Sequence, residues 1–122
     1  MVVTGRDEKA LSNAKDHVKR QLAYFGSTKA YRGVLELYGW GELQPKLNAL
    51  ARIGEWEEMA SLIDEDVLNT FAIVCPPEQV ATEIVNRYGG MIDRFRFYTP
   101  YAPDADHWQA IASEMRSLDA LL

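Results

Sequence analysis

The sequence predicts a mostly helical α/β fold with two or three short parallel strands, and three observations support this. Apolar residues recur at intervals of three and four along most of the 122 residues, as they do on amphipathic helices. Three short apolar segments, at 2–3, 71–74 and 92–98, are separated by these helical stretches. Strands that alternate with helices usually pair in parallel. The length is that of a single domain, so we expect one domain over residues 1–122.

The first helix is predicted from Asp7 to about Gly26, where glycine is a plausible stop. Its apolar positions are Leu11, Ala14, Val18, Leu22 and Phe25. Ser27 or Thr28 is expected to cap a second helix, because serine and threonine are preferred N-caps. That helix carries one apolar face and ends at 39–41, and the residues of this face are Tyr31, Val34, Leu35 and Tyr38.

Two more helices are predicted over 43–53 and 56–63, and a short helix near 67–71 leads into a strand at 71–74. Pro77 then begins a helix that Gly89 and Gly90 end. Its expected inward residues are Val80, Ile84, Val85 and Tyr88. We expect the tryptophans to be core anchors, namely Trp40, Trp56 and Trp108.

Residues 92–98 form the clearest predicted strand, because aromatic residues are frequent there. Phe95 and Phe97 share one face, and Arg94 and Arg96 share the other. We expect at least one of these arginines to be paired, because both faces of a barrel strand are partly buried. Asp104 is expected to cap a final helix whose inward residues are Trp108, Ile111, Met115 and Leu118.

Composition excludes several function classes. The net charge is −5, and an acidic chain repels the phosphates of nucleic acids. No apolar run is long enough to span a bilayer, and Cys75 is the single cysteine, so an internal disulfide is impossible. We therefore expect a soluble cytoplasmic protein that binds neither nucleic acid nor membranes. Two or three parallel strands would leave sheet edges unpaired, so the chain resembles part of a larger sheet.

Several segments resemble luciferase-like monooxygenases, and most closely the oxidoreductases that use the deazaflavin coenzyme F-420. They are Tyr24-Phe25-Gly26-Ser27-Thr28-Lys29-Ala30-Tyr31-Arg32, Leu35-Glu36-Leu37-Tyr38-Gly39-Trp40-Gly41 and Pro77-Glu78-Gln79-Val80-Ala81 before Gly89-Gly90. The resemblance covers essentially the whole chain. It implies a (β/α)8 TIM barrel, a fold of about 250 residues, of which this chain would be a C-terminal fragment.

The resemblance implies that Val2–Val3 belongs to strand six, 71–74 to strand seven and 92–98 to strand eight, with the helices between the first two as an enlarged insertion. Active sites of such barrels lie at the carboxyl ends of the strands. Those ends would be Thr4-Gly5, Cys75-Pro76 and 99–101. The family usually has Gly-Thr where this chain has Cys75-Pro76, and proline has no N–H for an anion. Anion binding before the helix at Pro77 is therefore in doubt.

The resemblance implies that Ser27, Thr28 and Tyr31 contact the cofactor, which is coenzyme F-420 or FMN in the intact family. The alternative is that the hydroxyls only cap a helix and the tyrosine only packs, which we favour by roughly two to one. Neither catalytic residues nor a metal site are assigned. His17 lies on a charged helix surface, and the metal-like run Asp104-Ala105-Asp106-His107 is better explained by the capping and dipole chemistry of a first helical turn. Cys75 has no sequence-local base.

We therefore expect a fragment of a flavin- or deazaflavin-dependent oxidoreductase or monooxygenase, which acts on a small molecule when intact and is inactive alone. This chain would then bind no cofactor by itself. The alternative is a non-enzymatic helical interaction module, or one chain of a split or homo-oligomeric assembly, in which orphaned strand edges pair with another chain.

Overall fold

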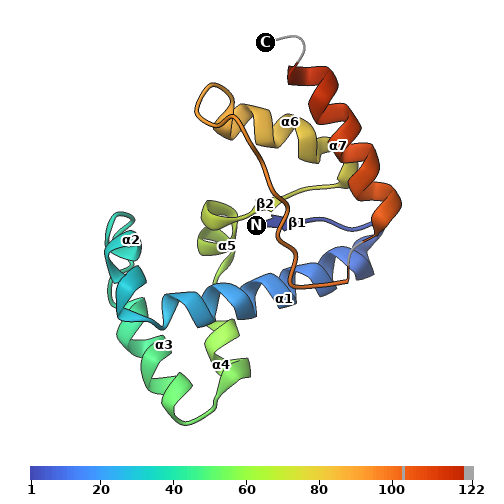
Figure 1. The fold of residues 1–122 in the computed structure, drawn as a ribbon. Helices are drawn as coiled ribbons and strands as arrows, with labels where there is room; N and C mark the ends of the chain where they lie inside the picture. Colours follow the sequence, from blue (N-terminus) through green and yellow to red (C-terminus); the bar gives the residue numbers. More distant parts are fainter. Residues whose placement is uncertain (103, 120–122) are drawn as a thin grey trace. The chain divides into compact units, whose positions relative to one another are not determined.

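The computed structural model describes residues 1–102 and 104–119, which form two short strands and a series of helices (Figure 1). The chain divides into two compact units. The sheet unit combines Met1–Lys15 with the region from Ala72 onward, and the helical unit is Asp16–Phe71. The first helix, α1 (Glu8–Gly26), contributes residues to both units.

The sheet unit contains β1 (Val2–Val3) and β2 (Ile73–Val74), which pair in parallel with Val2 opposite Ile73. The Ile73 N–H donates to the Met1 carbonyl at 3.0 Å, and the Cys75 N–H donates to the Val3 carbonyl at 3.2 Å. The predicted parallel arrangement of the first two apolar segments is confirmed. A two-residue strand offers few backbone bonds, so most of the stability of this unit must come from side-chain burial.

The start of α1 follows from its sequence. The Ala10 N–H donates to Asp7 Oδ1 at 2.8 Å, so Asp7 caps the helix. Before it, a Cβ on Gly5 would lie 2.4 Å from the backbone nitrogen of Leu11, so only glycine permits this close approach. The predicted helix from Asp7 to Gly26 is confirmed.

The core of the sheet unit lies between the strands and two helices, α6 (Pro77–Tyr88) and α7 (Ala105–Asp119). Its buried members are Val2, Ile73, Cys75, Val80, Ala81, Ile84 and Ile111. Because consecutive strand residues point to opposite faces, Val2 faces this core and Val3 faces away from it. The predicted capping of α7 is also confirmed, since the His107 N–H donates to Asp104 Oδ1 at 3.4 Å.

The predicted strand at 92–98 is wrong. Among the described residues the sheet has two strands, and 92–99 forms no ladder with either of them. The alternation within the segment was predicted correctly, because Phe95 and Phe97 pack against the core. The Phe97 ring lies 4.5 Å from that of Trp108 on α7, so side-chain packing rather than backbone pairing holds the segment.

The expectation that Arg94 or Arg96 is paired is also wrong. Both are exposed, and neither forms an ion pair within the described part of the chain. The expectation assumed a barrel strand with two covered faces. Because the segment covers the core as a single extended layer, its second face meets solvent and the guanidinium groups stay hydrated.

The helical unit contains a short 3₁₀ turn, η1 (Lys29–Tyr31), followed by four α-helices. They are α2 (Arg32–Glu36), α3 (Leu43–Arg52), α4 (Trp56–Ser61) and α5 (Glu65–Phe71). Side chains from several helices are fully or almost fully buried in this unit, and they are Val18, Leu35, Leu47, Met59, Ile63, Val67 and Leu68.

Two expectations about burial in the helical unit are corrected. Of the predicted apolar face on α2, only Leu35 is buried, whereas Tyr31, Val34 and Tyr38 are each more than 40% exposed. Trp56, the first residue of α4, is 53% exposed and is therefore not a core anchor. Trp40 and Trp108 are half-buried.

Candidate functional site

The carboxyl ends of β1 and β2 meet at one edge of the sheet, as parallel strands require. The register places Thr4 beside Cys75 at this edge. Tyr101, from the segment before α7, reaches the first strand, where its hydroxyl bonds the Val2 carbonyl. The structure therefore brings together residues from all three of the predicted strand ends, although the third belongs to no strand.

Tyr101 is bound to the backbone of the first strand. Its hydroxyl donates to the Val2 carbonyl at 2.7 Å. Burial raises the pKa of Tyr101, and the backbone N–H of Thr4 acts in the opposite direction. The phenol is therefore neutral at physiological pH and can serve as donor and acceptor at once.

The side chain of Thr4 is only 6% exposed, and its hydroxyl has no hydrogen-bond partner among the described residues. Buried polar groups in proteins are nearly always paired, so an unpaired hydroxyl calls for an explanation. Its location at the carboxyl edge of two parallel strands is the location at which barrel enzymes carry their active sites. Thr4 is thus a residue at this edge that offers hydrogen-bonding capacity to a ligand.

Cys75, next to Thr4 across the sheet, is a poor nucleophile. Burial, followed by the carboxylate of Glu83, raises the pKa of its thiol to about 11, while Arg87 acts in the opposite direction. Because the thiolate is the reactive species, a thiol with this pKa stays protonated at neutral pH. The thiol is 8% exposed and packs in the core of the sheet unit, as expected for a small apolar side chain.

The amino end of α6 also lies at the carboxyl edge of β2, but it is poorly equipped to bind phosphate. Pro76 occupies the N-cap position without a side-chain capping bond, and Pro77 is the first helical residue. Neither proline has an N–H, and the Gln79 N–H already donates to the Pro76 carbonyl at 3.0 Å. A phosphate here would meet few free donors, in agreement with the doubt raised by the sequence.

A charged pair lies at the start of α7. Arg6 forms an ion pair with Asp104, the residue that caps this helix. Desolvation acts in the opposite direction, but hydrogen bonds from the His107 N–H and from Arg6 hold the pKa of Asp104 below its usual value. These bonds link the segment after β1 to α7. Asp104 is thus engaged in structure and is not poised as a base.

The three predicted cofactor-binding residues lie in the helical unit, around the end of α1. The Ser27 hydroxyl donates to the Tyr24 carbonyl at 2.6 Å, and the Thr28 hydroxyl donates to the Phe25 carbonyl at 2.9 Å. Both hydroxyls therefore satisfy the last turn of α1. Thr28 is the N-cap residue of η1 but makes no side-chain capping bond there, so the expected cap of the following helix is wrong.

Ser27 is buried, and its backbone connects the end of α1 to α3. Its carbonyl accepts hydrogen bonds from Gln44 Nε2 at 2.9 Å and from Asn48 Nδ2 at 3.2 Å, both on α3. Tyr31 differs, because it is 44% exposed while its ring lies 5.6 Å from that of Phe25. Of the three predicted residues, Tyr31 is the one whose side chain is most accessible to a ligand.

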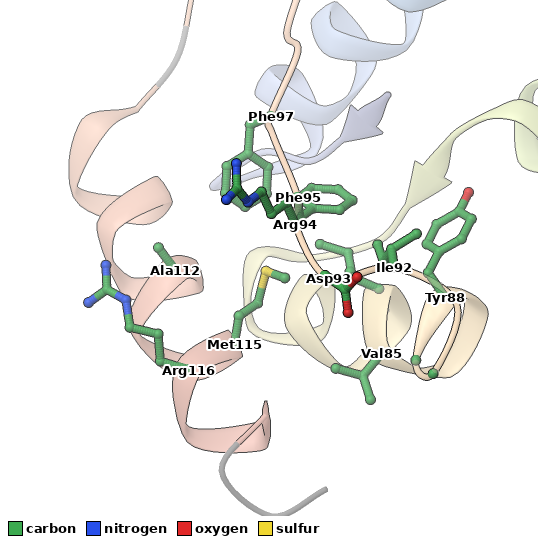
Figure 2. Close-up of a pocket in the computed structure, with 13 residues that line it drawn as sticks. Val85, Tyr88, Ile92, Asp93, Arg94, Phe95, Phe97, Ala112, Met115 and Arg116 are labelled. Atoms are coloured by element: carbon green, nitrogen blue, oxygen red, sulfur yellow. The ribbon is translucent and has the colours of Figure 1, made fainter.

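A hollow lies in the sheet unit, between α6, the segment after it and α7 (Figure 2). It is an open groove of about 280 Å³. Phe95, Phe97 and Met115 contribute apolar side chains, and Arg116 points away from the groove in Figure 2. Asp93 and Arg94 also line the groove, but its volume lies slightly below the roughly 300–1,000 Å³ of typical ligand pockets, so we assign no ligand to it.

Two further findings concern the part of the chain that the structure describes. It contains no cluster of three or more histidine, cysteine, aspartate or glutamate side chains placed to bind a metal ion. None of its helices combines the length and the apolar character needed to cross a membrane.

Sequence reasoning missed the role of Tyr101 and the unpaired hydroxyl of Thr4. Tyr101 lies between two prolines, where no periodicity indicates the direction of a side chain. The Thr4 hydroxyl could have been suspected, since a polar residue directly after a buried apolar pair marks the end of a strand.

Similar proteins occur in mycobacteria. Two proteins from strains of Mycobacterium tuberculosis and one from Mycobacterium bovis, all described as uncharacterized, are 47% identical to this chain over 94 residues. These residues are 77% of this chain but 28% of each relative, so the chain spans little more than a quarter of the relatives' length. No protein-family model and no solved structure matches the chain.

Proposed function

We propose that this chain is a C-terminal part of a luciferase-like oxidoreductase barrel, in which β1 and β2 are adjacent strands of the parallel sheet. The intact enzyme would act on a small molecule with reduced coenzyme F-420 or FMN. The chain alone would be inactive. Its contribution would be one section of the barrel wall, with the carboxyl edge at Thr4 and Cys75 facing the active site.

The observation that carries the proposal is the in-register parallel pair of β1 and β2, joined by helices along the chain. A parallel sheet in a finished protein is covered on both faces and extends over several strands. In this chain each strand has two residues, and side chains form hydrogen bonds with the backbone at the outer edge of each strand. The Tyr101 hydroxyl donates to the Val2 carbonyl of β1, and Arg87 Nη1 donates to the Ala72 carbonyl before β2 at 3.0 Å.

The size of the relatives agrees with this proposal. Because 94 residues are 28% of each relative, these proteins have roughly 340 residues, within the 200 to more than 400 residues of (β/α)8 barrels. The relatives therefore have enough additional chain for the remaining strands. Their activity is not described, so the oxidoreductase assignment rests on the resemblance of the segments around Ser27 and Pro77.

The described residues fit part of such a cofactor. In the sheet unit, the Thr4 hydroxyl has unused hydrogen-bonding capacity at the strand edge. In the helical unit, taken by itself, the ring of Tyr31 is 44% exposed, as contact with a planar ring system would require. The amino end of α6 is poorly suited to bind a phosphate, because Pro76 and Pro77 have no N–H. The chain would thus contact the ring system, and the phosphate would need donors from elsewhere.

The test is a cofactor titration. The purified chain is titrated with FMN and with coenzyme F-420, while cofactor fluorescence and the solution mass are measured. A second titration adds the rest of a Mycobacterium tuberculosis relative, expressed without the region that this chain matches. We expect no saturable binding by the chain alone and saturable binding by a one-to-one complex of the two polypeptides.

The matched variants are Tyr31→Ala and Tyr98→Ala, because both tyrosines are about half exposed. Tyr31→Ala is expected to weaken cofactor binding about tenfold, as loss of an aromatic contact of about 1 kcal/mol or slightly more would. Tyr98→Ala should leave it unchanged. A one-to-one complex that binds neither cofactor would contradict the proposal.

An interaction module is the second candidate, because apolar side chains near α2 are exposed. Their exposed fractions range from 41% to 82%, for Val34, Tyr31, Tyr38 and Leu37 in increasing order. Such a group of apolar side chains is typical of a protein contact. If the purified chain forms a discrete dimer that Leu37→Glu dissociates, this candidate is favoured; a monomeric wild-type chain would count against a homo-oligomer.

A further inference from the structure

The turn between α1 and η1 is held by two side chains of α3, and it carries the exposed ring of Tyr31. We propose that Gln44 and Asn48 form an amide clamp on the Ser27 carbonyl, and that Gln44 is thereby a positioning residue for the Tyr31 ring. The inference rests on the proposed function, because it explains how the chain holds the side chain that would contact the cofactor.

The amide clamp consists of two side chains on one side of α3. Gln44 Nε2 donates to the Ser27 carbonyl at 2.9 Å, and Asn48 Nδ2 donates to the same carbonyl at 3.2 Å. Residues four positions apart on a helix lie on the same face, so both amides reach the carbonyl together. A carbonyl oxygen has two lone pairs, and the clamp uses both of them.

Gln44 occupies an inward position of α3. It is 4% exposed, and Leu47, three residues later on the same helix, is fully buried. Burial of an amide costs free energy unless its polar atoms are paired, whereas an apolar side chain of similar length would fill the same space without that cost. What the amide adds at this position is therefore a directed bond to the Ser27 carbonyl.

The clamp is the long-range part of the bonding at this turn. The hydroxyls of Ser27 and Thr28 donate to carbonyls three residues earlier, so they connect the turn to the last turn of α1. The bonds from Gln44 and Asn48 instead span 17 and 21 positions. They fix the turn relative to α3, which the local hydroxyl bonds do not do.

Tyr31 follows the clamped carbonyl by four residues. Its N–H donates to the Thr28 carbonyl at 3.2 Å, which closes η1 directly after the clamp. Its ring lies 5.6 Å from the ring of Phe25 and is tilted by 43° to it, while the side chain is 44% exposed. A ring that is held in place before a ligand arrives loses less conformational entropy on binding.

The first experiment measures amide hydrogen exchange at Tyr31 by NMR in the full chain. Gln44→Met keeps the length of the side chain and removes the N–H donor. Exchange at the Tyr31 amide should accelerate about tenfold, because the turn opens more easily when a buried hydrogen bond is lost. Unchanged exchange would show that the clamp does not hold the turn, and the proposal would fall.

The matched control is Ile63→Val. Ile63 is 2% exposed and follows α4 in the same unit, so its truncation also lowers stability but leaves both amides in place. Exchange at Tyr31 should stay at the wild-type rate. If Gln44→Met does not fold, Asn48→Leu replaces it: Asn48 is only partly buried, and loss of the longer bond should accelerate exchange about threefold.

The second experiment measures FMN and coenzyme F-420 binding by the one-to-one complex with the rest of the Mycobacterium tuberculosis relative. Gln44→Met should weaken binding about fivefold, because the Tyr31 ring must then be ordered when the cofactor binds. In a Tyr31→Ala background, Gln44→Met should cause no further loss, since Gln44 acts through Tyr31. Ile63→Val should bind as tightly as the wild type.

The outcomes separate this inference from the proposed function. If Gln44→Met binds the cofactor as tightly as a wild-type complex that does bind it, the positioning role is overturned and the proposed function stands. A loss of the same size with and without the Tyr31 ring also overturns the positioning role. No cofactor binding by any form overturns both. Faster exchange at Tyr31, with a loss of affinity that disappears in the Tyr31→Ala background, supports the proposal.

Discussion

Replacement of Thr4 by valine tests the unusual feature of the strand edge. Valine has the shape of threonine without the hydroxyl, and the Thr4 hydroxyl is buried without a partner in the described part of the chain. An unpaired buried polar group costs about 1–3 kcal/mol. Thr4→Val should therefore stabilise the protein by about 1–2 kcal/mol, since part of the cost is relieved by local adjustment.

The matched control is Thr28→Val. The Thr28 hydroxyl is partly buried but donates to the Phe25 carbonyl at 2.9 Å. Its removal leaves that carbonyl without this partner and should cost about 0.5–1.5 kcal/mol. The same chemical change is thus expected to have opposite signs at the two sites, which removes any general effect of valine from the comparison.

The assay is thermal and urea unfolding followed by circular dichroism. For a chain of 122 residues, 1 kcal/mol shifts Tm by about 4 °C. Thr4→Val should raise Tm by about 4–8 °C, and Thr28→Val should lower it by about 2–6 °C. A loss of stability of 1 kcal/mol or more in Thr4→Val would refute the reasoning, because it would mean that the hydroxyl has a partner.

Two further predictions concern the core of the sheet unit. Ile84 is 2% exposed, so Ile84→Ala should lower the free energy of unfolding by about 2–5 kcal/mol, whereas Ile53 is 71% exposed and Ile53→Ala should lower it by less than about 1 kcal/mol. Similar losses for the two variants in urea unfolding would contradict the described core. Cys75, with its pKa raised to about 11, should react slowly with iodoacetamide at pH 7. As pH rises from about 9 through 11, stability should fall by roughly 2–3 kcal/mol, because only the unfolded chain has lost the proton at the start of this range. If the urea midpoint of the wild type changes no more over this pH range than that of Cys75→Ala, the second prediction is contradicted.

Local signals in the sequence predicted most helices. The helix from Asp7 to Gly26 was recognisable from its apolar spacing and its glycine, and the helix after Pro77 from its proline and Gly89. These signals act within a few residues of the position they determine. The strand at 92–98 was predicted wrongly because alternating side chains show which face is apolar but not whether a partner backbone lies alongside.

The candidate site was less accessible to sequence reasoning. Ser27 and Thr28 were placed correctly at a helix break, but their hydroxyls bind the preceding turn of α1, a choice that depends on backbone geometry. The assignment of Ser27, Thr28 and Tyr31 to a cofactor stays a prediction. At the sheet edge, Tyr101 and Val2 are 99 positions apart, so their hydrogen bond had no local signal.

The sequence by itself determined the helical periods, the cap at Asp104, and the acidic charge that disfavours nucleic acid, because each depends on neighbouring residues or on composition. Only the tertiary structure decided which apolar segments pair and why Leu37 is exposed while Leu47 is buried. It also decided that the hydroxyl of Tyr101 lies at the outer edge of β1. Such facts depend on groups brought together from distant positions, and burial and hydrogen bonding across those distances arise only when the whole chain has folded.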